Sequence, residues 1–202
     1  MNLAPEDYDF GNIENYSFAM EVTCSNDEAR KMFILAYGHM LNYNHEEAIA
    51  CFSKCAELDP DCAMAWWGIA YCVSSNYNWT PGLGSGYDPI QMAISLKEGC
   101  SEMEQDLIDA LAERHSEEAR DAADPSVLNM GNSAELNIAF AEAMAPLYEK
   151  YSGNLDVTAI YVEALMNLKA WQLWDKDTKT GEITPADENT LLLVKILEDA
   201  FE

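Results

Sequence analysis

Apolar side chains recur every three or four residues along most of this chain, which is the spacing of one face of an α-helix. The pattern predicts helices over 26–41, 45–58, 61–75, 101–115, 133–151 and 155–168, with two more beginning at 88 and 184. Val and Ile do not alternate with polar residues, so we expect no strand. The predicted fold class is all-α, with antiparallel helix-turn-helix repeats and irregular loop insertions.

Local signals mark where these helices begin and end. Ser25 with Glu28, and Ser101 with Glu104, have the spacing of a capping box, in which side chain and backbone N–H groups bond reciprocally. Asn44 precedes the second helix and is expected to cap it. His115 lies near a helix end, where the helix dipole favours a cation.

Segments without helical periodicity divide the chain. Residues 1–24 are expected to form an extended N-terminal arm, and residues 25–202 to form one helical-repeat domain. Insertions at 76–87, 116–131 and 169–183 interrupt the repeat period.

The last predicted helix has more apolar residues than one buried face needs: Leu191, Leu192, Val194, Ile196, Leu197, Ala200 and Phe201. We therefore expect the chain to be the N-terminal part of a longer array, whose next repeat covers this helix. Two alternatives are that Phe201 packs back on the domain, and that a second subunit covers the helix in a homo-oligomer.

The helix pair over 29–60 resembles the tetratricopeptide repeat, a 34-residue helix-turn-helix with small residues where its helices approach closely. With Pro60 as the closing proline, Ala48 and Phe52 match the A and F positions of the pattern. The W, L-G and Y positions are taken by Met32, Leu35-Ala36 and His39, and one period later by Trp66, Ile69-Ala70 and Val73.

The chain also resembles the N-terminal part of a widespread, uncharacterised tetratricopeptide-repeat family. The similar blocks are 43–48, 59–68, 76–78 and 163–175. The resemblance implies an α-solenoid that binds proteins in a concave groove, and it implies no settled activity.

The net charge of −25, from 11 Lys and Arg against 36 Asp and Glu, narrows the choice of partners. Nucleic acids and anionic membranes would be repelled, whereas a basic protein segment would be attracted. The N-terminus lacks the basic start and apolar run of a signal peptide, so we expect a cytoplasmic protein.

No recognised catalytic or cofactor-binding motif occurs, so we expect no cofactor and a binding protein rather than an enzyme. The six cysteines include no C-x-x-C pair and no zinc-type spacing. This favours buried free thiols over a metal or disulfide role.

The candidate binding residues fall into two groups. The twin stretches containing Asn44-His45 and Asn76-Tyr77-Asn78 should share one edge of the repeat stack, either as a polar ligand pocket or simply as helix caps. The predicted concave face contains His39, Met40, Trp67 and Tyr71, although a histidine at position 39 also suits packing.

Two residues are candidate metal ligands, His45 and Glu163, the second because its carboxylate lies inside an apolar helix.

The sequence supports three hypotheses of function. The first is a scaffold that binds a peptide or protein in a concave groove. The second is a small-molecule or metal-binding protein, either by itself or as part of an enzyme, and the third is a structural subunit of a larger assembly.

Overall fold

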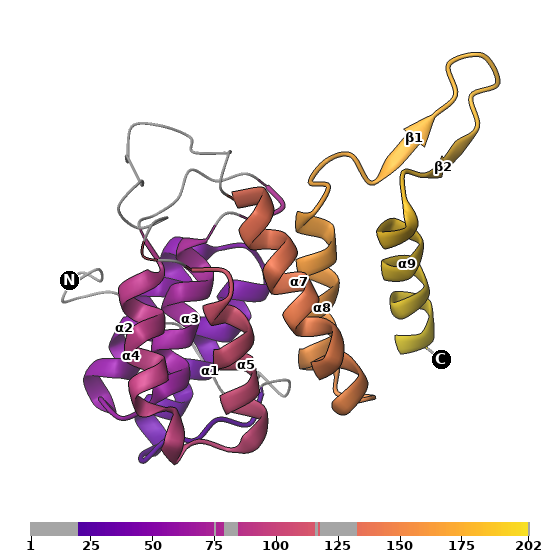
Figure 1. The fold of residues 1–202 in the computed structure, drawn as a ribbon. Coiled ribbons are helices and arrows are strands. Elements are labelled where there is room, and N and C mark those ends of the chain that lie inside the picture. Colours follow the sequence, from indigo (N-terminus) through magenta and orange to yellow (C-terminus); the bar gives the residue numbers. More distant parts are fainter. Residues whose placement is uncertain (1–19, 75, 79–84, 116, 118–132, 202) are drawn as a thin grey trace. The chain divides into compact units, whose positions relative to one another are not determined.

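The computed structural model describes residues 20–74, 76–78, 85–115, 117 and 133–201. Within these ranges the chain forms eight α-helices, one 3-10 turn and a two-stranded sheet (Figure 1). It divides into two compact units. The first comprises Met1–Ser74 with Gly82–Asn129, and the second comprises Ser75–Pro81 with Met130–Glu202.

The first unit is a series of helices in which each packs against the next. They are α1 (Asp27–Leu41), α2 (His45–Leu58), α3 (Ala63–Val73), α4 (Tyr87–Leu96), the 3-10 turn η2 (Lys97–Gly99) and α5 (Glu102–Ala112). Only residues 42–44 join α1 to α2, and they reach about 10 Å when extended, whereas α1 spans about 22 Å. Because α1 and α2 pack against each other, this short connection makes the two helices run in opposite directions.

The helix starts follow the sequence signals in part. The capping box at Ser101 and Glu104 is confirmed. The box predicted at Ser25 is wrong by one residue, because Asn26 accepts the bond from the backbone N–H of Ala29. Asn44 stands at the cap position of α2, but its side chain makes no capping bond.

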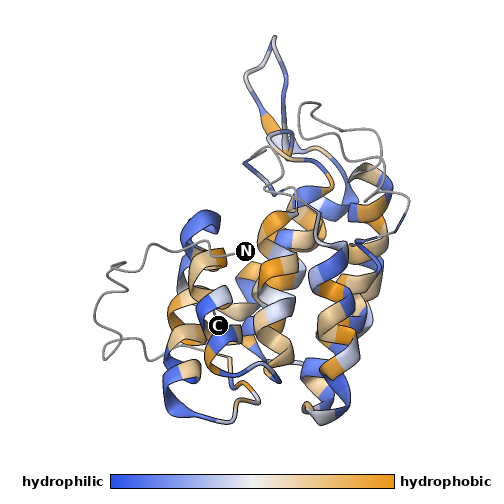
Figure 2. Cartoon of the chain, turned by 90° about the vertical axis from the view of Figure 1, so that its left-hand side faces the viewer, coloured by the Kyte–Doolittle hydropathy of each residue, from blue (hydrophilic) through white to orange (hydrophobic). Residues whose placement is uncertain are grey.

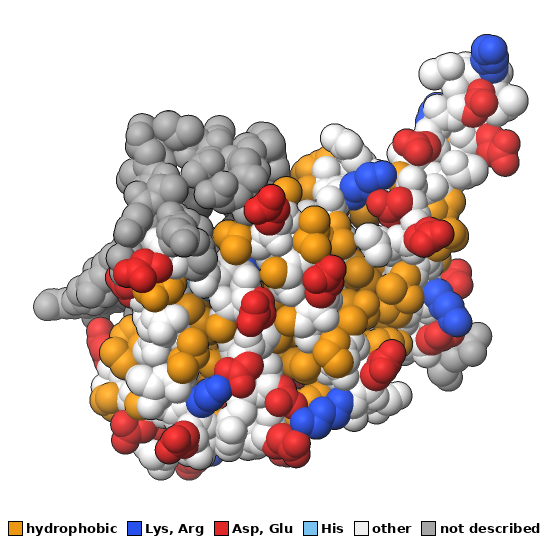
Figure 3. Space-filling view, viewed as in Figure 1, with side chains coloured by type: hydrophobic (Ala, Val, Ile, Leu, Met, Phe, Trp, Pro, Cys, Tyr) orange, Lys and Arg blue, Asp and Glu red, His pale blue; other side chains and the backbone are white. Residues whose placement is uncertain are grey.

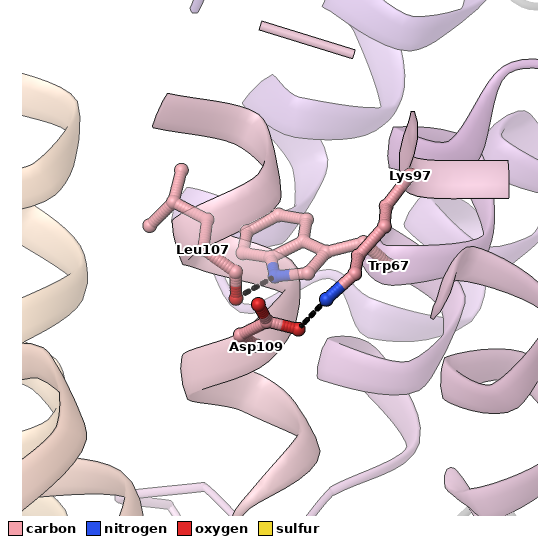
Figure 4. A network of polar contacts seen from close by, with 4 residues as sticks. All are labelled: Trp67, Lys97, Leu107 and Asp109. Carbon is pink, nitrogen blue, oxygen red and sulfur yellow. Dashed lines mark hydrogen bonds and ion pairs between the residues drawn. The ribbon is translucent and has the colours of Figure 1, made fainter. Parts of the chain in front are cut away.

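The core of the first unit surrounds α3, which is buried on almost every side. Phe33, Phe52 and Trp67 are fully buried, and the Phe33 and Phe52 rings meet edge to face with centroids 5.5 Å apart. The indole N–H of Trp67 donates to the backbone carbonyl of Leu107 in α5 at 3.1 Å (Figure 4). This bond satisfies the one polar atom of a buried indole and ties α3 to α5.

The second unit contains three helices and a hairpin. These are α7 (Ser133–Lys150), α8 (Leu155–Asn167), β1 (Trp174–Lys176), β2 (Ile183–Pro185) and α9 (Glu188–Ala200). α8 packs against both α7 and α9. The predicted helix over 155–168 is confirmed, and Gly153 in the preceding turn has a φ of 82°, which a glycine adopts without strain.

The hairpin corrects two expectations, that the chain has no strand and that its last helix begins at 184. The strands pair antiparallel, and each has three residues, too few to show alternation. Their loop is closed by the Asp177 carboxylate, which accepts the backbone N–H groups of Lys179 and Thr180, and it is mostly hydrophilic (Figure 2). The helix begins later because Asp187 caps it by accepting the N–H of Thr190 at 2.8 Å.

The predicted N-terminal arm and insertions are described only in part. Three parts of the predicted segments lie outside the described residues: 1–19 of the arm, 79–84 of the first insertion, and 116 with 118–131 of the second. Residues 20–24 of the arm are not helical, and Met20 and Val22 are buried. No helix among the described residues is long and apolar enough to cross a bilayer.

Gly68 in α3 offers a test of the α2–α3 packing. A methyl group at this position would overlap the ring of Phe52, which is itself fully buried. Alanine normally stabilises a helix by about 1 kcal/mol relative to glycine, but overpacking a core costs about 1–3 kcal/mol. We expect Gly68→Ala to lower the free energy of unfolding, measured by urea denaturation.

Gly99 is the matched control, because a methyl group there meets no atom within 4 Å. We expect Gly99→Ala to change the free energy of unfolding by less than about 0.5 kcal/mol. A Gly68→Ala protein more stable than wild type would show that the two helices do not approach this closely.

Candidate functional site

The predicted concave face is filled by packing. Met40, Trp67 and Tyr71 are each 2 % exposed or less, and α5 contacts α3 over the Trp67 indole. His39 is half-buried in the last turn of α1. The Trp67 and Tyr71 rings are therefore interior residues of the first unit rather than the walls of an open groove.

His45 begins α2 and is buried at 6 % exposure. Its Nδ1 lies 3.1 Å from the backbone carbonyl of Cys72, which fixes Nδ1 as the protonated nitrogen, and its ring stacks on Tyr43. The imidazole thus joins the start of α2 to the end of α3, which is a structural role.

The other predicted polar residues do not form one described cluster. Asn44 is exposed, at the start of α2 in the first unit. Asn76 belongs to the second unit and is buried, and its side-chain oxygen accepts the N–H of Asn78 in a local turn. Because the two stretches belong to different units, the edge that they were expected to share stays a prediction.

Glu163 is half-buried on α8. Among the described residues, one group of three potential ligand side chains lies close enough to hold a metal ion, and neither Glu163 nor His45 belongs to it.

The group consists of the thiols of Cys24, Cys55 and Cys62, and we call it the thiol cluster. The three sulfur atoms lie within 4.8 Å of one another, and those of Cys55 and Cys62 are 3.9 Å apart. Cys55 is in the last turn of α2, Cys62 is the N-cap of α3, and Cys24 precedes α1. Cys55 and Cys62 are buried, whereas Cys24 is partly accessible.

Hydrogen bonds that do not use the thiols hold the segment containing Cys24 against the turn between α2 and α3. The Asp59 carboxylate accepts the backbone N–H of Ser25 at 2.5 Å, and the Asn26 side chain donates to the carbonyl of Leu58 at 3.1 Å. On the other side, the Arg30 guanidinium donates to the carbonyls of Val22 and Cys24. The Glu104 carboxylate also accepts two bonds from Thr23. The backbone positions of all three cysteines are therefore set independently of sulfur chemistry.

The three thiols differ in acidity. The Cys55 thiol donates to the Cys62 sulfur, which raises the pKa of Cys55 and lowers the pKa of Cys62. The backbone N–H of Ala65, in the first turn of α3, lowers the Cys62 pKa further. Burial raises the pKa of Cys24 to about 11. Cys62 is thus the sulfur that loses its proton first.

Asp59 adds a negative charge beside the thiol cluster. Burial alone would raise the pKa of its carboxyl group, but hydrogen bonds from Ser25 and Cys24 outweigh burial and lower that pKa. The carboxylate is therefore ionised and already bonded at neutral pH.

The thiol cluster was not predicted from the sequence. Cys55 and Cys62 lie on either side of Asp59-Pro60, where one helix was predicted to end. Two helices that run in opposite directions from such a turn bring the residues on its two sides close together. This spacing was the signal in the sequence for the Cys55–Cys62 contact. The position of Cys24 was not accessible to that reasoning, because it depends on tertiary hydrogen bonds made by a segment without periodicity.

A second surface feature is an open hollow between α1 and α2, with a volume of about 330 Å³. It is lined by Glu28, Lys31, Met32, Lys54 and Leu58. The Lys54 ammonium group is already paired with Glu57 at 2.9 Å. The hollow has no buried polar group directed into it and is not a convincing ligand site.

Comparison of the chain with protein-family models, with curated proteins and with solved structures gives no match. Functional conclusions therefore rest on the geometry of the described residues.

His115 corrects the expectation of a cation at a helix end. α5 ends at Ala112, and burial, followed by the charge of Arg114, lowers the pKa of His115 to about 3. Its Nε2 lies 3.2 Å from the hydroxyl of Ser74, and its ring fills the space beside Gly86. The imidazole is therefore neutral in the folded protein at neutral pH.

This shift predicts how stability depends on pH. The unfolded chain binds a proton at His115 below pH 6.5 and the folded chain does not, so stability falls as the pH drops below 6.5. The loss attributable to this group between pH 7.5 and 5.5 is about 1.4 kcal/mol. We expect His115→Gln to lack this part of the pH dependence in urea denaturation. Parallel curves for the two proteins would contradict a neutral, buried His115.

Proposed function

We propose that this chain is a helical-repeat scaffold that binds a protein partner. Support comes from the equivalence of α1 and α3. Leu35 and Ala36 in α1, and one 34-residue period later Ile69 and Ala70 in α3, are all buried. The same class of position is therefore used for packing in both helices, as a tetratricopeptide-type repeat requires.

The observation that carries the binding proposal is the apolar surface of α9. Leu193 and Ile196 are buried and supply the face that packs in the second unit. Leu191, Leu197 and Phe201 are 56 %, 37 % and 89 % exposed. We call these three residues the α9 stripe. Exposed apolar area of this kind gains about 25 cal/mol for each Å² that a partner covers.

The charge around the α9 stripe indicates the chemistry of the partner. Glu188, Glu198 and Asp199 are exposed on α9 beside a single exposed lysine, Lys195. Figure 3 shows the same mixture over the face it displays, with carboxylates outnumbering basic groups between hydrophobic side chains. An amphipathic helix with basic flanks complements both the stripe and the net charge of −25.

A photo-crosslinking amino acid at Leu191 tests the proposal in the full chain. We expect a discrete crosslinked protein whose attached peptide is amphipathic and basic, because the α9 stripe buries apolar side chains beside carboxylates. The identified partner is then titrated against the double variant Leu191→Glu, Phe201→Glu, for which we expect affinity to fall by at least about 10-fold.

The control is Leu155→Glu, which adds one negative charge, where the double variant adds two, at a leucine that is 66 % exposed on α8. We expect this variant to bind the partner like wild type. Equal affinities for the control and the double variant would contradict binding at the α9 stripe.

The same stripe also favours a second candidate function, self-association in a larger assembly. Size-exclusion chromatography with light scattering separates the two functions. A dimer that becomes a monomer in the Leu191→Glu, Phe201→Glu variant would assign the stripe to a second copy of the chain and contradict the separate partner.

A further inference from the structure

We propose that the thiol cluster of Cys24, Cys55 and Cys62 is a binding site for a thiolate-preferring divalent metal ion of the zinc class. The proposal is independent of the scaffold function, because it concerns a different surface in the first unit. It rests on the spacing of the sulfur atoms, on how their backbones are held and on the place of Cys62 in the fold.

The spacing matches metal coordination. Zinc binds cysteine sulfur at about 2.3 Å in tetrahedral geometry, which places two ligand sulfurs about 3.8 Å apart. The Cys55 and Cys62 sulfurs are 3.9 Å apart, and all three lie within 4.8 Å of one another. A disulfide would require about 2.05 Å, so the sulfurs are arranged around a common point rather than as a bonded pair.

The ligand positions are preorganised. Three separate segments contribute one sulfur each, and the bonds of Ser25 to Asp59 and of Asn26 to Leu58 hold two of these segments together without using any thiol. Little ordering is therefore needed when an ion enters, and the partly accessible Cys24 provides a route to it.

The position of Cys62 suits a thiolate ligand. Cys62 stands at the N-cap position of α3, beside the positive end of the helix dipole. An incoming cation displaces the protons of all three thiols, so three protons are released as three sulfur–metal bonds form. Binding should therefore weaken as the pH falls.

We assign the fourth position of the ion to solvent. The Asp59 carboxylate is already bonded to Ser25. Cys62 is close enough to Cys100 to raise the pKa of Cys100, but Cys100 is outside the group of three. Three protein ligands and one open position are the arrangement of metal sites that exchange a ligand.

Cobalt(II) is the probe for the first experiment, because its charge-transfer absorption reports thiolate bonds directly. The untagged chain, reduced and freed of metal with a chelator, is titrated with cobalt under nitrogen and then with zinc. We expect thiolate–cobalt absorption that saturates at one equivalent per chain, disappears when zinc is added and weakens at lower pH.

Cysteine variants locate the site. We expect Cys62→Ser and Cys24→Ser to lower zinc affinity by more than the 10–100-fold that is typical for loss of an outer-shell group. Cys51→Ser and Cys72→Ser are matched controls, because both cysteines are buried in the first unit outside the cluster, and they should bind like wild type. Cys100→Ser should also bind like wild type if solvent is the fourth ligand.

A second measurement guards against variants that fail to fold. Zinc should raise the thermal unfolding midpoint of the wild-type chain but not of Cys24→Ser, whose cysteine is the most accessible of the three. Circular dichroism confirms that the variant is helical before it is compared.

Two results would overturn the proposal. One is the absence of thiolate–cobalt absorption in the folded wild-type chain, or equal absorption in Cys62→Ser. The other is an intact mass two hydrogens lower without reductant, mapped to a disulfide within the cluster, in a chain that does not bind zinc after reduction.

Discussion

The architecture of the first unit depends on the buried carboxylate of Asp59. It sits at the turn between α2 and α3 and accepts the backbone N–H of Ser25, which lies 34 positions earlier in the chain. A buried charge is stable only when it is bonded, and leaving a buried acceptor without its hydrogen bond costs about 1–3 kcal/mol. The bond therefore closes a loop that contains α1 and α2 and holds the preceding segment against the start of α3.

Two consequences follow from this closure. The segment before α1 is held near Glu104, whose carboxylate accepts two hydrogen bonds from Thr23. The segment therefore also contacts the start of α5. The closure also brings Cys24 to the sulfurs of Cys55 and Cys62. The thiol cluster is thus a product of the same interaction that organises the helices.

The burial of α3 decides which surfaces remain for function. Because α5 covers Trp67, the face expected to form a groove is part of the core. Among the described residues, two features offer chemistry that the fold does not use: the α9 stripe offers apolar area, and the thiol cluster offers soft ligands. One suits a protein partner and the other a metal ion, and they lie in different units.

The sequence predicted helices well where periodicity is long. The spans of α1, α2 and α8 agree with the structure to within about two residues, because each has an apolar stripe bounded by a polar cap or a proline. The hairpin of β1 and β2 was missed because its strands are short and its formation depends on the Asp177 turn. Asp187 then moved the start of the last helix.

The candidate site was less predictable than the fold. His45 was predicted either as a ligand residue or as part of a helix cap, whereas its buried contact with the Cys72 carbonyl depends on helix packing that periodicity does not specify. The cysteines were judged by their separation along the chain, whereas Cys24 reaches the cluster through hydrogen bonds of the backbone around it. A site whose residues are brought together by hydrogen bonds between distant segments has no local motif in the sequence.

Hydrogen exchange on the wild type and on Asp59→Asn tests the role of this carboxylate most directly. Asparagine keeps the shape of the side chain and removes its charge. The account predicts that amides of residues 22–26 lose protection in the variant and that zinc affinity falls with it, while amides within α2 and α3 stay protected. Unchanged protection at 22–26, or a uniform loss across all helices, would contradict it.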